Sequence, residues 1–139
     1  MIELRLDCDP TPWVAPTKGR NGFYDKKSKE KEFIRWQIKS QYKGPLLNCF
    51  VALEFIFLIP LQKNISKRDL KRKIDREILP TSPDTTNMQK LYEDCLQGIV
   101  IENDRLSYKI TSSRYYSERP GVEIKVHPWP ETQNNKGDI

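Results

Sequence analysis

The most informative segment of the chain reads Pro83-Asp84-Thr85-Thr86-Asn87-Met88-Gln89-Lys90-Leu91-Tyr92-Glu93-Asp94-Cys95-Leu96-Gln97-Gly98. Its apolar residues recur at i, i+3, i+4 and i+7, which is the spacing of one buried face of a helix. These residues are Met88, Leu91, Tyr92 and Cys95. We therefore predict a helix over about 85–97, with Gly98 as its C-terminal cap.

Polar residues border this apolar face. Asn87, Lys90 and Asp94 lie at i, i+3 and i+7, and Asp84 stands where the helix begins. Asp104 follows shortly after the helix, so a turn in the chain can bring it back toward Asp84. We predict that this polar row and the two aspartates converge on one site.

The flanking segments predict both strands and helices. Period-two alternation predicts a strand over 1–7, and the apolar run over 48–59 predicts a central strand covered on both faces. Helices are predicted over 28–42 and from Ser66, with Leu70, Ile74 and Ile78 inward in the second. Further strands are predicted over 99–102, 106–112 and 121–126, and 8–27 is predicted to be an irregular loop.

These elements indicate an α+β fold, a two-layer domain with a mixed β-sheet packed against helices. The domain is expected to cover residues 1–128. Residues 129–139 form a polar tail that we expect to be disordered.

Composition narrows the function. A net charge of +5 favours polyanionic partners such as nucleic acid. The three cysteines, Cys8, Cys49 and Cys95, form no CxxC pair and with one histidine provide too few ligands for structural zinc. No signal peptide and no membrane-spanning segment is expected, so we predict a cytoplasmic protein.

The acidic residues suit metal-assisted hydrolysis of phosphodiesters. Mg²⁺ prefers oxygen ligands and can activate water beside a phosphate, and a lysine can offset the charge that develops there. The residues alone favour a structural interpretation over this one. In that interpretation Asp84 is a helix N-cap, Asp94 a solvated side chain and Asn103-Asp104 a hairpin turn.

The motif Pro-Asp-x-x-Asn-x-x-Lys-x-x-x-Asp-x-Leu-x-Gly over 83–98, followed by an acidic turn, resembles the RusA family of Holliday junction resolvases. The order of the surrounding segments is also similar, with Gly44-Pro45 before a strand that ends at Pro60, a basic segment before the motif, and Arg119-Pro120-Gly121 after it. The resemblance covers about 44–126 closely and 1–43 loosely.

The resemblance implies roles for individual residues. Asp84 corresponds to a metal-binding aspartate, Lys90 to the catalytic lysine, and Asp104 to the second acid of an Asp-Asp turn. Asn87 and Asp94 correspond to supporting positions. The family further implies a homodimer that binds four-way junctions and nicks them with Mg²⁺, with Mn²⁺ as an alternative, and a bacterial or phage origin.

The sequence departs from the family pattern at three positions. Thr86 replaces an aspartate, Asn103 replaces the first acid of the turn, and Leu106 stands where glutamine is common. We expect Asp84, Asp104 and Glu102 to hold the metal, with Thr86 as a weak ligand. Glu54, in the apolar strand, is a further candidate for a substitute carboxylate. The alternative is that its side chain points to solvent or pairs with a lysine.

Basic residues are expected to contact DNA phosphates. These are Lys18, Arg20, Lys26, Lys27, Lys67, Arg68, Lys71 and Arg72. Trp13, Phe23 and Tyr24 are candidates either for stacking on unpaired bases or for anchoring in the core.

Three functions are compatible with these residues. The first is a structure-selective endonuclease acting on branched DNA. The second is a junction-binding protein with weakened or lost cleavage, which the replacements at Thr86 and Asn103 favour. The third is an unrelated small basic adaptor.

Overall fold

The computed structural model describes residues 1–130 and contains one four-stranded mixed sheet, a separate two-stranded hairpin and three α-helices. The predicted α+β fold is confirmed, and residues 131–139, most of the predicted tail, lie outside the described part. The elements are β1 (Ile2–Leu6), β2 (Thr17–Gly19), β3 (Gly22–Tyr24), α1 (Ser28–Gln41), β4 (Val51–Pro60), α2 (Lys67–Ile74), α3 (Thr85–Leu96), the 3₁₀ turn η1 (Asp104–Leu106), β5 (Ser107–Ser117) and β6 (Gly121–Pro128).

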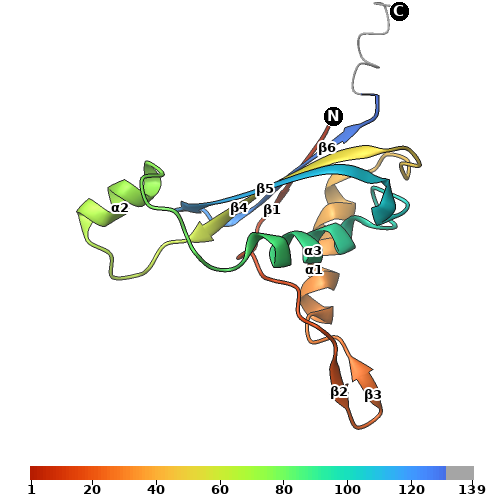
Figure 1. Ribbon diagram of the computed structural model, residues 1–139, viewed down its shortest axis with the longest axis horizontal. Helices are drawn as coiled ribbons and strands as arrows, with labels where there is room; N and C mark the ends of the chain where they lie inside the picture. Colours follow the sequence, from red (N-terminus) through yellow and green to blue (C-terminus); the bar gives the residue numbers. More distant parts are fainter. Residues whose placement is uncertain (131–139) are drawn as a thin grey trace, which may run out of the picture.

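The strands of the main sheet are ordered β1-β6-β4-β5 (Figure 1). The central strand β4 pairs antiparallel with β6 and parallel with β5. The parallel pairing requires a crossover between β4 and β5, and α2 and α3 form that connection. The crossover therefore carries the polar segment 83–98 across the sheet.

Helices α1 and α3 cover one face of the sheet (Figure 1). Alternate residues of β4 point into this layer, and Leu53, Phe55 and Phe57 are at most 1% exposed. Tyr92 of α3 is fully buried and its ring lies 5.7 Å from that of Phe57. The core is therefore the layer between the sheet and the two helices.

The opposite face of the sheet remains partly exposed, so the prediction that β4 is covered on both faces is wrong. Glu54, Ile56 and Leu58 alternate with the core residues and are half-buried. The Glu54 carboxylate lies 4.0 Å from the ammonium of Lys125 on β6. Glu54 therefore pairs with lysine, as the alternative for this residue predicted.

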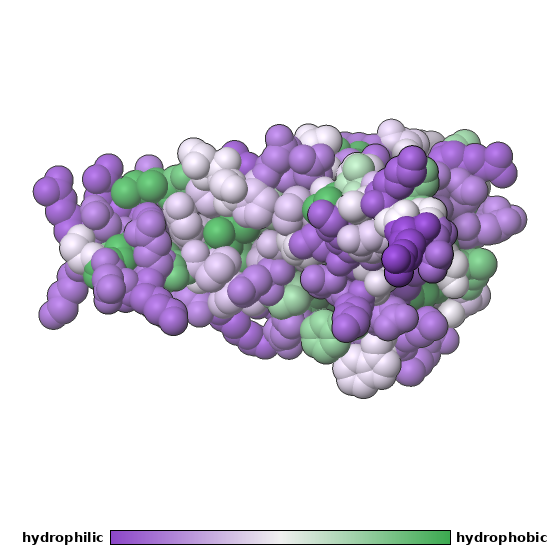
Figure 2. All heavy atoms as spheres, turned by 90° about the horizontal axis from the view of Figure 1, so that it is seen from below, coloured by the Kyte–Doolittle hydropathy of each residue, from purple (hydrophilic) through white to green (hydrophobic). Residues whose placement is uncertain are grey.

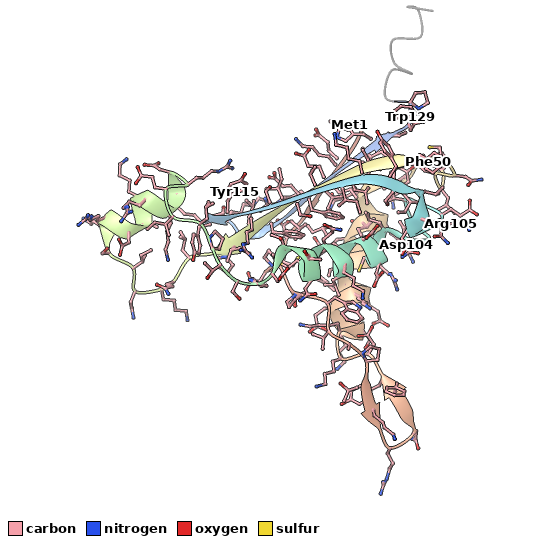
Figure 3. The ribbon with its side chains drawn as sticks, in the orientation of Figure 1. Met1, Phe50, Asp104, Arg105, Tyr115 and Trp129 are labelled. Carbon is pink, nitrogen blue, oxygen red and sulfur yellow. The ribbon has the colours of Figure 1, made fainter. Side chains whose placement is uncertain are left out.

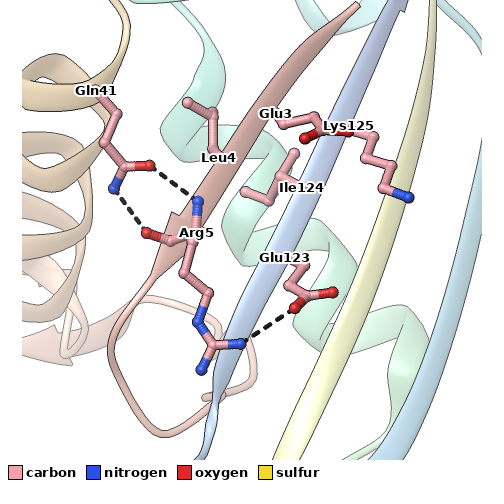
Figure 4. A pocket seen from close by; sticks show the side chains of 7 residues that line it. All are labelled: Glu3, Leu4, Arg5, Gln41, Glu123, Ile124 and Lys125. Atoms are coloured by element: carbon pink, nitrogen blue, oxygen red, sulfur yellow. Dashed lines mark hydrogen bonds and ion pairs between the residues drawn. The ribbon is translucent and has the colours of Figure 1, made fainter.

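Two glutamines of α1 protect the edge strand β1. The Gln41 side chain accepts from the Arg5 amide at 2.9 Å and donates to the Arg5 carbonyl at 2.6 Å, and the Arg5 guanidinium reaches Glu123 at 3.3 Å (Figure 4). One turn earlier, the Gln37 side chain accepts from the Asp7 amide at 2.9 Å. These amides satisfy backbone groups that a sheet edge otherwise leaves unpaired.

Three local predictions differ from the structure. The segment 8–27 contains the β2–β3 hairpin, which polar and glycine-rich composition concealed. Residues 99–102 form a turn with an isolated bridge from Ile101 to Leu47 in place of a strand. Asn103-Asp104 opens η1 and leads into β5, which pairs with β4, so it forms no hairpin.

Helix α2 also differs from its prediction, because it buries none of its residues. Ile74 is 42% exposed, and the helix extends from the end of the sheet (Figure 1). Its N-terminus is as predicted, since the Ser66 hydroxyl accepts from the Asp69 amide at 3.2 Å. Cation–π contacts hold the segment near β5, with Lys73 4.4 Å above Tyr116 and the Arg76 guanidinium 3.8 Å above Tyr115.

Candidate functional site

Helix α3 is held on the sheet by the apolar face that the sequence predicts. Met88, Leu91, Tyr92 and Cys95, joined by Leu96, are fully buried. The rotation that buries these side chains turns Asn87 and Lys90 to solvent, whereas Asp94 is half-buried. The predicted polar row is thus present on the exposed side of α3.

Asp84 lies at the beginning of α3 as its N-cap. One carboxylate oxygen accepts from the Thr86 amide at 2.8 Å, which satisfies one of the amides left free at a helix start. The Arg114 guanidinium of β5 donates to the Pro83 carbonyl at 2.7 Å and fixes this end of the helix. Asp84 and Thr86 remain exposed, so the structural role of Asp84 leaves it accessible.

Asp104 lies beyond the other end of α3. It belongs to η1 at the start of β5, whereas α3 begins on the side of the sheet where Tyr115 lies (Figure 3). Burial raises the pKa of Glu93 above its usual value, and the neighbouring carboxylates of Asp104 and Asp94 raise it further. Glu93 therefore joins Asp94 and Asp104 in an acidic group at the C-terminal half of the helix.

The acids consequently form two sets separated along α3, so the prediction that the polar row and both aspartates converge on one site is wrong. Nine residues at about 1.5 Å each place Asp84 about 14 Å along the axis from Glu93. Within residues 1–130, no three Asp, Glu, His or Cys side chains stand close enough to hold a metal ion. The predicted ligands Asp84 and Thr86 lie at one end and Asp104 lies beyond the other, with Glu102 exposed just before it, so the described side chains do not fit a divalent-ion site in this conformation.

Lys90 has a specific partner that the sequence did not indicate. Its ammonium lies 3.5 Å from the centroid of the Trp13 ring, well within the range of cation–π attraction. The Trp13 amide donates to the Asn87 carbonyl at 2.9 Å, and the ring packs against the core. Trp13 thus anchors the N-terminal segment to α3 and holds Lys90. No spacing rule predicts this contact, because it joins residues 77 positions apart.

The predicted DNA-binding residues fall into two projecting groups. Lys18 and Arg20 are exposed on the β2–β3 hairpin, and Lys26 is exposed just after it. The four residues of α2 predicted to bind DNA, Lys67, Arg68, Lys71 and Arg72, are also exposed. Two of them have acidic partners: Lys71 pairs with Asp75 at 2.7 Å and Arg72 with Glu77 at 3.5 Å. Lys27 is half-buried and donates to the Thr11 hydroxyl at 2.7 Å, so its main contact is within the protein.

The two projections leave the body in different directions, and α3 spans the angle between them in the view of Figure 1. Seen from the side of the hairpin, the surface is predominantly hydrophilic (Figure 2). An exposed lysine between basic projections suits contact with an extended polyanion.

A comparison with protein-family models matches residues 9–127 of the 139 to the model described as Endodeoxyribonuclease RusA. The chain belongs to the RusA endodeoxyribonuclease family. The match begins in the N-terminal loop, so it extends the resemblance well beyond the α3 motif. A search of curated proteins finds no match.

Membership of the RusA family supports nuclease activity, and the family acts broadly as Holliday junction resolvases. RusA nucleases are generally dependent on divalent metals. In the described residues, no helix is both long enough and apolar enough to cross a membrane.

Proposed function

We propose that this RusA-family chain is a structure-selective endonuclease that resolves four-way or branched DNA by hydrolysing phosphodiester bonds. The observation that carries the proposal is the family match over 9–127 combined with the exposed face of α3, where Lys90 stands between two basic projections. A lysine held in place can stabilise charge that develops on a phosphate during cleavage. Asp84, Lys90 and Asp104 are the proposed catalytic residues, supported by Asn87 and Asp94.

DNA binding is assigned to the basic residues of the hairpin and α2. Their exposed ammonium and guanidinium groups suit phosphates, which position DNA without reading its sequence. Lys67 and Arg68 of α2 and Lys18 and Arg20 of the hairpin are the principal candidates, because all four are exposed. Branched DNA offers phosphates in two or more directions, which suits two projections better than one straight duplex does.

Mg²⁺, with Mn²⁺ as an alternative, is the proposed cofactor, because it prefers carboxylate oxygens as ligands and the family generally uses divalent metals. The proposed ligands form two sets, Asp84 and Thr86 at the start of α3 and Asp104 and Glu102 beyond its other end, because one ion cannot contact both ends of the helix. Calorimetric titration of Mg²⁺ into wild type and Asp104→Asn tests this assignment. We expect weaker binding by the variant, and equal binding would contradict it.

A second function is favoured by the separation of the acids. A RusA-family protein that binds junctions without cutting them needs the basic surface but no assembled acidic site. Within residues 1–130 the acidic side chains form no metal-holding group, and Thr86 and Asn103 replace two acids of the family pattern. This binding protein is the alternative to the nuclease.

An assay with an end-labelled four-way junction and a duplex of the same sequence separates these functions. The nuclease predicts nicks in the junction strands in Mg²⁺ or Mn²⁺ and an intact duplex. Junction binding without nicks in either metal would exclude the nuclease and support the alternative. Equal binding of junction and duplex in the presence of competitor DNA would support an unrelated basic adaptor.

We also propose that two copies act together, since symmetric cleavage of a four-way junction requires two active sites. The partly exposed sheet face with Ile56 and Leu58 is the proposed contact between copies. Sedimentation analysis of wild type and Ile56→Lys tests the dimer, and a wild-type monomer at assay concentrations would contradict it. DNA as the substrate is consistent with a cytoplasmic protein of bacterial or phage origin.

A further inference from the structure

The β2–β3 hairpin carries an aromatic side chain, Phe23, that the core does not bury. Its strands pair Thr17 with Tyr24, Lys18 with Phe23 and Gly19 with Gly22, around the turn Arg20-Asn21. The hairpin forms a sheet of its own and extends away from the body beyond α1 (Figure 1). Gly22 has φ +109°, a conformation that suits glycine in a tight turn.

The two aromatic rings of the hairpin differ in what they contact. A side-chain carbon added at Gly19 would lie 3.0 Å from Tyr24 Cδ1, so the Tyr24 ring packs over that glycine and braces the hairpin. Phe23 is 74% exposed, the largest value for any large hydrophobic residue within 1–130. An apolar ring at this position gains nothing from the core and is accessible to a partner outside the chain.

The charge around Phe23 indicates which partner it meets. Lys18 is its direct cross-strand neighbour, so the ammonium and the ring lie on the same face of the hairpin. The segment 15–24 contains Lys18 and Arg20 and no acidic residue. An exposed ring beside cations suits a nucleotide, because the ring stacks on a base while the cations contact phosphates.

The base of the hairpin is fixed beside the candidate site. The Asp25 carboxylate pairs with Lys31 of α1 at 2.7 Å and accepts from the Lys27 amide at 2.8 Å. On the other strand, the chain advances seven residues from Trp13 to Arg20, at most about 25 Å in extended form. The tip therefore lies within one turn of B-DNA, about 34 Å, of the contact between Trp13 and Lys90.

We propose that the β2–β3 hairpin recognises the branch point of the DNA, with Phe23 stacked on an unpaired base and Lys18 and Arg20 on the flanking phosphates. A continuous duplex keeps its bases stacked on one another and offers Phe23 no free base face. The hairpin thereby makes binding selective for branched DNA. This inference rests on the proposed function and names the feature of the substrate that the protein detects.

Affinity measurements in EDTA, where no metal-dependent cleavage occurs, test the hairpin. The probes are a four-way junction and a duplex of the same sequence, and the variants are Phe23→Ala, Phe23→Trp and, as a matched control, Phe33→Ala on α1, whose ring is 51% exposed. We expect Phe23→Ala to bind the junction about 5- to 150-fold more weakly, the loss of about 1–3 kcal/mol of stacking on one base, and the duplex unchanged. Phe23→Trp is expected to retain junction binding, and Phe33→Ala to match wild type.

Photocrosslinking gives a second readout. With 5-iodouracil at the branch point, we expect the crosslink to map to Phe23, and with 5-iodouracil ten base pairs away we expect none there. If wild type prefers the junction and Phe23→Ala shows the same preference, the role of the hairpin is overturned and the proposed function is left intact. No wild-type preference for the junction would overturn both. Loss of self-association by Phe23→Ala, with junction selectivity retained, would instead make the hairpin a contact between copies.

Discussion

The contact between Trp13 and Lys90 is the most direct link between the N-terminal segment and the proposed chemistry. Replacing Trp13 by leucine removes the ring and leaves the amide that donates to the Asn87 carbonyl. The ammonium lies 3.5 Å from the ring centroid, and the indole is half-buried, so we expect the pair to contribute about 0.5–2 kcal/mol. Trp13→Leu also loses packing against the core, which a single substitution cannot separate from the cation–π contact.

A double-mutant cycle isolates the contact. The free energy of unfolding is measured in urea for wild type, Trp13→Leu, Lys90→Met and the double variant, so that the packing loss cancels. We expect a coupling of about 0.5–2 kcal/mol and near-zero coupling between Trp13→Leu and Lys39→Met, which alters an exposed lysine of α1. A Trp13–Lys90 coupling below about 0.3 kcal/mol would refute the contact as a source of order at Lys90.

Three further predictions concern the edge, the core and the DNA surface. Gln37→Leu is expected to lower the free energy of unfolding in urea by about 1–3 kcal/mol, because it leaves the Asp7 amide without a hydrogen-bond partner. Gln41→Leu is expected to cost only about 0.5 kcal/mol, because Gln41 is exposed and water can bind the freed Arg5 amide in its place. Equal losses in the two variants would contradict this. Burial raises the pKa of the Cys95 thiol from 9.0 to about 11. Because the thiol ionises at lower pH in the unfolded chain than in the folded protein, its contribution to the free energy of unfolding is complete below pH 9 and is lost as the pH rises to 11. That loss is about 2–3 kcal/mol in wild type, and we expect Cys95→Ala to lack it when unfolding is followed from pH 8 to 11. In anisotropy titrations, replacing Lys67 and Arg68 together by alanine is expected to reduce the slope of log K against log salt by about 2, and an unchanged slope would remove α2 from the DNA surface.

The fold could be predicted largely because hydrophobic periodicity determines which faces are buried. Helix α3 follows its i, i+3, i+4 spacing to within one residue, and β4 lies in the predicted apolar run. The hairpin was not predicted because Thr17–Tyr24 has no apolar alternation and buries nothing. Helix α2 shows the converse error, since its apolar spacing indicated a buried face although its contact with β5 buries none of its residues.

The candidate site was predictable in its residues and unpredictable in its distances. The spacing of Asn87, Lys90 and Asp94 along one helix correctly placed them beside the core stripe. Sequence spacing could not show that Asp104 lies beyond the far end of α3, because this depends on β5 pairing parallel with β4. Nor could it identify Glu93 or the contact of Trp13 with Lys90, because both depend on how distant segments pack.

The central claim is that the exposed face of α3 is where the DNA backbone is cut. Its most direct test is the single-turnover rate of nicking of a labelled four-way junction by wild type, Lys90→Met and Lys39→Met, with junction affinity measured in parallel. The account predicts a loss of about 100-fold or more for Lys90→Met at nearly unchanged affinity, and a wild-type rate for Lys39→Met. Nicking by Lys90→Met at the wild-type rate would contradict it.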